Sequence, residues 1–142
     1  MTSRLDLMRQ VMAAWAAGDI DGVVGHMSDD IVWHYAAATH PPVRGTVQVR
    51  KLLGVLQAEM HDVVWTVFAS AETADRLFIE GVDSYTAANG ARIATPYMGI
   101  VEFRGDLITG WRDYVDLGVA AAQRAGEPNP PHVQELLDRS ST

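Results

Sequence analysis

The second half of the chain alternates apolar and polar residues over long stretches, and this alternation restricts the fold more than any other feature. Alternation with a period of two is typical of strands that bury one face. Asn89-Gly90 and Gly105-Asp106 are tight-turn signals, so the strands on either side of each pair form hairpins. The sequence therefore predicts an antiparallel sheet whose long strands cover roughly 62–70, 76–87, 91–104 and 107–117.

The first half of the chain is mainly helical by pattern. Ser3 can cap a helix in which apolar residues recur every three to four positions. Strand alternation occurs only once here, with Ile31, Trp33 and Tyr35 on one face. The expected elements are a helix from Ser3 to Gly18, a short helix from Ile20 to Met27, a strand from Asp30 to Ala37, a proline-set loop over 39–45 and a helix from Val47 to Met60.

The order of these elements defines the fold class. Helices come first and an antiparallel sheet follows, which is an α+β order. A curved sheet wrapped over helices leaves a pocket between them, a common place for a ligand. We expect one domain over residues 1–142, with an alanine-rich helix from Leu117 to Gly126 and a peripheral tail over 127–142 that contains a short helix at 132–140.

Composition excludes several classes of function. The formal net charge of −7 opposes binding to nucleic acid or to an anionic membrane, because both need a basic patch. The absence of cysteine removes disulfides and thiolate nucleophiles. The five histidines show no metal-ligand spacing, so we expect neither a metal nor another cofactor. The start lacks the apolar run of a secretion signal, and we expect a cytoplasmic protein.

Two aspartates are the clearest candidates for chemistry. Asp83 and Asp113 each lie on the apolar face of a predicted strand, where an unpaired carboxylate is costly to bury. If the two faces converge, two carboxylates meet in one apolar pocket. Repulsion and desolvation then raise one pKa enough to keep a proton while the other group ionises. The pair is thus a candidate acid and base.

The segments GVDSY, TPYMGIVEF and GDLITGWRDYVDL resemble the limonene epoxide hydrolase and SnoaL-like branches of the nuclear-transport-factor-like superfamily. The resemblance extends to about residue 118, and GWRDYVDL is its most specific piece. It implies a cone-shaped, cystatin-like roll of curved mixed sheet with a deep apolar pocket. It also implies a homodimer and a small apolar ligand.

Within the epoxide hydrolase branch, the resemblance implies roles for single residues. Asp113 falls on the base that activates water, Asp83 on the acid that protonates the epoxide oxygen, and Tyr35 on a tyrosine that holds the water. Two positions depart from the pattern. Ala37 replaces a water-holding asparagine, and Gly81 replaces an arginine that lies between the acids.

The remaining candidates belong to the pocket wall. Strand alternation turns the candidates on the predicted strands toward the inner face of the sheet. His40, in the proline loop, is expected at the rim of the pocket. Tyr97 can also offer a hydroxyl to the pocket. The expected substrate-binding residues are Trp33, Tyr97, Thr95, Trp111, Val115 and His40.

Three functions follow from these observations. The first is cofactor-free hydrolysis of a terpenoid-like epoxide by Asp113 and Asp83. The second is proton transfer next to a carbonyl, as in SnoaL-like polyketide cyclases or ketosteroid isomerases, which the two departures favour. The third is a non-catalytic ligand-binding module, since one fold hosts many functions.

Overall fold

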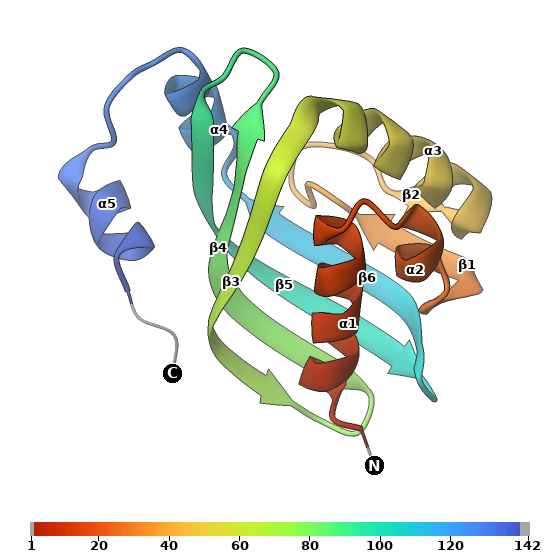
Figure 1. The fold of residues 1–142 in the computed structure, drawn as a ribbon. Coiled ribbons are helices and arrows are strands. Elements are labelled where there is room, and N and C mark those ends of the chain that lie inside the picture. Colours follow the sequence, from red (N-terminus) through yellow and green to blue (C-terminus); the bar gives the residue numbers. More distant parts are fainter. Residues whose placement is uncertain (1, 140–142) are drawn as a thin grey trace.

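A computed structural model describes residues 2–139 of the chain. A six-stranded sheet forms the centre, and its strands lie in the order β2-β1-β6-β5-β4-β3 (Figure 1). All neighbouring strands are antiparallel except β1 and β6, which are parallel. The elements are α1 (Arg4–Ala16), α2 (Ile20–Val24), β1 (Met27–His34), β2 (Val43–Arg44), α3 (Gly45–Glu59), β3 (Met60–Glu72), β4 (Arg76–Ala87), β5 (Arg92–Arg104), β6 (Leu107–Val115), α4 (Leu117–Arg124) and α5 (Pro131–Leu137).

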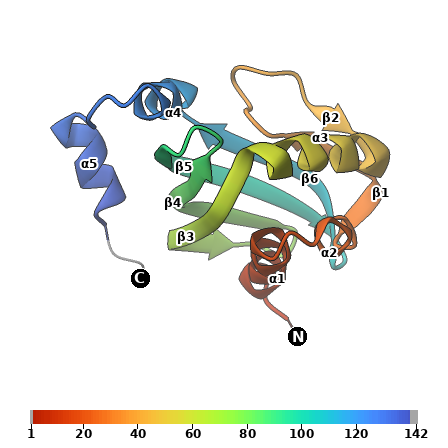
Figure 2. The same ribbon diagram turned by 45° about the horizontal axis from the view of Figure 1, so that its top comes forward.

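The helices α1, α2 and α3 lie over one face of the curved sheet, as Figures 1 and 2 both show. The core lies between these helices and the sheet. Met8 and Val11 of α1, Val49 of α3, and Leu77 and Ile79 of β4 are all buried there. This face is the inner face of the sheet.

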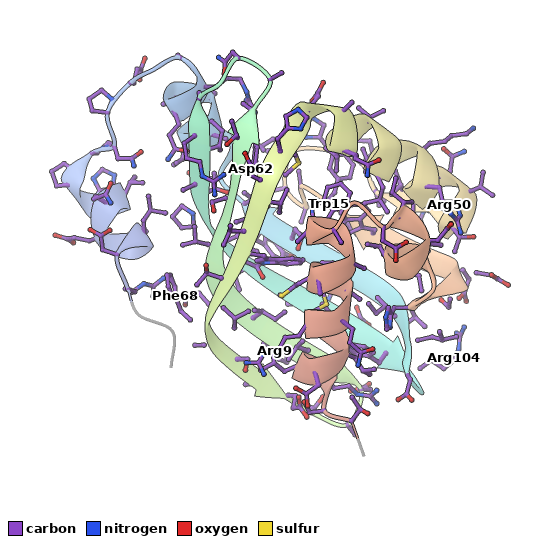
Figure 3. All side chains as sticks on the ribbon, viewed as in Figure 1. Arg9, Trp15, Arg50, Asp62, Phe68 and Arg104 are labelled. Carbon is purple, nitrogen blue, oxygen red and sulfur yellow. The ribbon has the colours of Figure 1, made fainter. Side chains whose placement is uncertain are left out.

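The C-terminal helix α5 lies on the outer face. Arg139 follows α5 and forms an ion pair with Glu80, whose side chain leaves β4 on the face opposite Asp83. The guanidinium of Arg139 also lies 5.2 Å from the ring centre of Phe68 on β3, which Figure 3 shows beside the end of α5. The predicted peripheral tail thus packs on the outside of the sheet as far as Arg139, and residues 140–142 lie outside the described part.

Most of the predicted elements agree with the structure. Ser3 caps α1 as expected and accepts a hydrogen bond from the Asp6 amide. The turn glycines Gly90 and Gly105 have φ values of 86° and 60°, which glycine adopts without strain. The α+β fold with a curved mixed sheet is confirmed.

Three boundaries were wrong. The strand predicted from Asp30 to Ala37 lies at Met27–His34, and Tyr35 belongs to the turn after it. The second helix ends at Val24 because β1 begins at Met27. The loop predicted over 39–45 contains the two-residue strand β2, which pairs with Val32 and Trp33. In each case pairing with a neighbouring strand decided the boundary, and a local pattern does not contain that information.

Strands β3 and β4 approach each other closely at Gly81. A Cβ atom on Gly81 would lie 1.8 Å from the carbonyl oxygen of Thr66. The register of the two strands also shifts between Val67 and Ala69, which marks an irregularity beside this glycine. Only a residue without a side chain fits this position in the present backbone.

We therefore expect Gly81→Ala to lower the free energy of unfolding by about 1–3 kcal/mol or more, since the strands must separate to admit a methyl group. Gly54→Ala is the matched control, because Gly54 lies exposed in α3 and a methyl group there would have no neighbouring atom within 4 Å. That variant should gain about 0.5–1 kcal/mol. Urea unfolding of both variants measures the difference, and equal stability of the two would contradict the close approach.

Candidate active site

A cavity of about 350 Å³ lies between the inner face of the sheet and the helices. Its wall is mostly apolar and aromatic, which is typical of a site for a small apolar molecule. All four tryptophans of the chain line it, and Trp15 comes from the end of α1 (Figure 3). The lining residues are Val11, Trp15, Val23, Met27, Trp33, Tyr35, Ala36, His40, Leu53, Leu56, Glu59, Met60, Trp65, Asp83, Tyr85, Thr95, Tyr97, Trp111, Asp113, Val115, Leu117, Ala120 and Arg124.

Asp113 is held in this wall by two indole groups. The Nε1 of Trp33 donates a hydrogen bond to Oδ2 at 3.0 Å, and the Nε1 of Trp111 donates one to Oδ1 at 2.6 Å. Gly99, its partner on β5, leaves space for the carboxyl, because a Cβ there would lie 3.2 Å from Oδ1. Both oxygens are thus fixed by uncharged donors.

Burial raises the pKa of Asp113 to about 7. The two indole donors favour the ionised form and limit this rise, while the negative charge of Asp83 adds to it. Asp113 therefore exchanges its proton near neutral pH, where a general acid or base is most effective.

Asp83 lies on the inner face of β4, opposite Trp65 of β3 and Thr95 of β5. Burial raises its pKa to about 6, and the positive charge of Arg92 opposes the rise. Within the described residues its carboxyl accepts no hydrogen bond, so its pKa is set by burial and by nearby charges.

Tyr97 lies between the two acids in the register of the sheet. It pairs with Gly81 on β4 and with Val115 on β6, and on its face of β5 it stands between Thr95 and Gly99. Burial raises the pKa of the Tyr97 hydroxyl, and both acids add to the rise, so the hydroxyl keeps its proton. Its oxygen has no hydrogen-bond partner of good geometry within the described residues, and the same holds for the indole nitrogen of Trp65 beside it.

The two departures from the epoxide hydrolase pattern have structural consequences. The Thr66 carbonyl oxygen of β3 occupies the place where a side chain of residue 81 would begin, so no arginine fits at Gly81 without a change in the backbone. Ala37 contributes its backbone amide, which donates to the carbonyl oxygen of Asp113 at 2.9 Å. This bond attaches the turn after β1 to β6, the strand that holds Asp113. Arg112 does not replace the missing arginine, because it forms an ion pair with Glu102 on the outer face.

The structure places all nine predicted site residues on the wall of this one cavity. Tyr35 packs against Trp33 with ring centres 6.0 Å apart and against His40 at 5.6 Å. Thr95 is buried, while His40 is exposed at the rim as predicted. The shared location supports the choice of residues, and the role of each one stays a prediction.

Sequence reasoning missed several polar or aromatic residues of the wall. Trp65 faces Asp83 across the sheet and stacks on Trp111 at 5.7 Å with an angle of 10° between the ring planes. Its alternation with Val63 and Val67 could have indicated an inward position. Tyr85 also lines the cavity, and strand alternation places it on the same face of β4 as Asp83. Glu59 and Arg124 line the cavity as well, but they come from α3 and α4, and no local pattern links them to the strands.

Within residues 2–139 no group of three or more histidine, aspartate or glutamate side chains could hold a metal ion. None of the described helices has the length and hydropathy needed to cross a membrane.

The sequence of residues 8–111 matches the model of the SnoaL-like domain. The chain belongs to the SnoaL-like domain family. The matched range includes Asp83 and Trp111 and ends two residues before Asp113. No curated protein matches the chain by sequence.

Three of the solved structures that resemble this SnoaL-like chain illustrate the breadth of the fold. A protein with the ketosteroid isomerase-like fold from Catenulispora acidiphila, solved in complex with trimethylamine, is 23% identical with a TM-score of 0.76, and the match covers 88% of this chain and 98% of that one. An LEH-like epoxide hydrolase from M. tuberculosis is 21% identical with a TM-score of 0.72 over 84% and 87% of the two chains. A protein assigned as a SnoaL-like polyketide cyclase from Shewanella denitrificans is 13% identical with a TM-score of 0.79 over 87% and 98%. These likenesses establish the nuclear-transport-factor-like fold, which unrelated activities share.

The raised pKa of Asp83 predicts how stability depends on pH. The folded chain keeps the Asp83 proton up to about pH 6, whereas the unfolded chain loses it near 3.8. The folded state therefore binds more protons between these values, and the free energy of unfolding falls as the pH rises through this window. Relative to Asp83→Asn, the wild type should lose about 1–3 kcal/mol between pH 4 and pH 7. Urea unfolding at stepped pH measures this difference, and a constant difference would show that Asp83 is not desolvated.

Proposed function

We propose that this protein is a cofactor-free enzyme that moves a proton next to the carbonyl of a small apolar molecule, with Asp113 as the general base. One observation supports the proposal most directly: the Asp113 carboxyl lies in an aromatic cavity, is oriented by two indole donors and has a pKa of about 7. A carboxylate with a raised pKa is a stronger base than an exposed one. It is also partly ionised at neutral pH, so it is available to accept a proton.

The same group can complete the reaction. After Asp113 accepts a proton from a carbon next to the carbonyl, an enolate forms and the substrate oxygen gains negative charge. Asp113 then returns the proton to another carbon of the same substrate, which gives isomerisation. If instead the enolate carbon attacks a second carbonyl of the substrate, a carbon–carbon bond closes a ring and the π bond of that carbonyl breaks to give an alkoxide. The alkoxide then takes the proton back from Asp113. Neither route needs a covalent intermediate or an added cofactor.

Proton transfer fits this cavity better than epoxide opening does. Epoxide opening needs Asp113 ionised and Asp83 protonated together, whereas burial raises the pKa of both carboxyls, so burial does not assign these opposite roles to the two acids. The water-holding asparagine and the bridging arginine are replaced by Ala37 and Gly81, and Gly81 has no space for a side chain. Proton transfer by a single base requires none of these groups.

Epoxide hydrolysis is the second candidate. The observation that favours it is that Asp83, Asp113 and Tyr35, which match the acid, base and water-holding tyrosine of that mechanism, all line one cavity. A non-catalytic binding module is the third candidate, and the two desolvated carboxyls weigh against it, because a purely apolar wall would be more stable. The cytoplasmic location and the homodimer stay predictions.

The test of the leading candidate is hydrogen exchange. Wild type and Asp113→Asn are incubated in D₂O with cyclic β,γ-unsaturated ketones and aromatic β-keto esters, and deuterium uptake next to the carbonyl is followed by NMR. We expect exchange above the uncatalysed rate with the wild type and a loss of about 10²–10⁴-fold in the variant. Unfolding midpoints of both proteins control for misfolding.

Parallel incubations with terpene and cyclohexene epoxides in ¹⁸O-labelled water test the second candidate. Labelled diol without carbonyl exchange would reverse the order of the two candidates. Exchange that is equal in wild type and Asp113→Asn would remove Asp113 from the mechanism.

Removal of one indole donor should change the pH dependence of the reaction. The Trp33 N–H stabilises ionised Asp113, so Trp33→Phe should raise the pKa of Asp113 and move the rising limb of the rate profile up by about half a unit to one unit. Trp15→Phe is the control, because Trp15 lines the same cavity without bonding to Asp113. Deuterium exchange rates from pH 5 to 9 measure both profiles. If the pH–rate profiles of both variants shift by the same amount, the shift comes from altered packing of the cavity and not from the lost hydrogen bond to Asp113.

A further inference from the structure

Four of the residues that line the cavity are exposed, and they define its mouth: His40, Glu59, Leu117 and Arg124. The other lining residues are buried or half-buried. The mouth thus combines the loop after β1, the end of α3 and both ends of α4. Three of these four residues are polar or charged, whereas the interior is mostly aromatic and aliphatic.

Arg124 is the one lysine or arginine among the described residues that line the cavity. Its Nη2 donates a hydrogen bond to the Tyr85 hydroxyl oxygen at 2.9 Å. No ion pair found within residues 2–139 includes Arg124, in contrast to most arginines of the chain. Because a guanidinium has five N–H donors, several remain for a ligand at the mouth.

The Tyr85 hydroxyl is a second donor at the same place. Its oxygen accepts the bond from Arg124, so its own proton points elsewhere. Burial and the nearby acids raise the pKa of Tyr85, and the hydroxyl keeps this proton at neutral pH. Tyr85 is also the next inward-facing residue of β4 after Asp83, on the side toward α4.

We propose that Arg124 and Tyr85 recognise a carboxylate at the outer end of the ligand, while the apolar body of the ligand fills the aromatic cavity. This inference rests on the proposed function in taking the cavity as the ligand site, and it adds the chemical class: an apolar carbonyl compound that also has a carboxylate. A guanidinium with an adjacent hydroxyl matches the two oxygens of a carboxylate. The ligand would then be held with its charge at the solvent and its reacting carbon toward Asp113.

Glu59 supplies an independent test of the location. It lies at the same mouth and contributes to the raised pKa of Tyr85, so its charge acts at the place where the carboxylate would bind. Repulsion by Glu59 weakens an anion bound there. Removal of this charge should therefore strengthen carboxylate binding, opposite in sign to the effect of removing Arg124.

The experiment measures binding without turnover. Three probes share one apolar body and differ in the head group: 4-cyclohexylbutanoate, its methyl ester and 4-cyclohexylbutylammonium. Because all four tryptophans line the cavity, tryptophan fluorescence reports its occupancy. The proteins are wild type, Arg124→Gln, Glu59→Gln and the charge-matched control Arg44→Gln. Arg44 is exposed, lies outside the cavity and forms no ion pair within the described residues.

We expect the wild type to bind the carboxylate about fivefold to tenfold more tightly than the ester, which is typical of a partly exposed charge-assisted hydrogen bond. Arg124→Gln should abolish this preference, Arg44→Gln should keep it and Glu59→Gln should increase it. Equal or tighter binding of the ester or the ammonium overturns the proposal, as does a preference that survives in Arg124→Gln or a failure of all three probes to bind. A carboxylate preference without deuterium exchange would reject only the proposed reaction.

Discussion

The pairing of β5 with β4 on one side and β6 on the other is the constraint on which the candidate site depends. In this register Gly99 lies opposite Asp113, Tyr97 lies opposite Gly81, and Thr95 lies opposite Asp83. Side chains alternate between faces, so all these residues face the helices only if all three strands keep their register. A slip of one residue in β4 or in β6 would turn the acid on that strand to the outer face.

The two acids are costly to the folded state. Each is desolvated, and neither has an ion-pair partner among the described residues, so ionisation is shifted toward neutral pH. The wall limits this cost for Asp113 with two neutral donors, Trp33 and Trp111, which orient the carboxyl without cancelling its charge. An arginine in their place would lower the pKa of Asp113 and weaken it as a base. The aromatic wall therefore serves both to hold the carboxyl and to keep its proton exchangeable.

Predictions from sequence succeeded where local pattern and tertiary structure required the same conformation. The hairpin turns at Gly90 and Gly105 and the alternating strands that hold Asp83 and Asp113 are of this kind. They failed where a contact from a distant part of the chain set the boundary. Tyr35 leaves the strand because the turn after β1 is attached to β6 through the Ala37 amide. Trp65, Glu59 and Arg124 reach the cavity from three elements that only the folded chain brings together.

The sequence by itself determined the α+β order of elements and the inward position of the two aspartates, because alternation and turn chemistry act over a few residues and need no distant partner. It also showed that Gly81 stands where the epoxide hydrolase pattern has an arginine. Only the tertiary structure decided that β3 leaves no space for a side chain at Gly81. It also decided that two indole N–H groups donate to Asp113 and that Arg124 lies at the cavity mouth beside the Tyr85 hydroxyl. Each of these depends on the distance between segments far apart in the chain, and that distance is set by the packing of the whole fold.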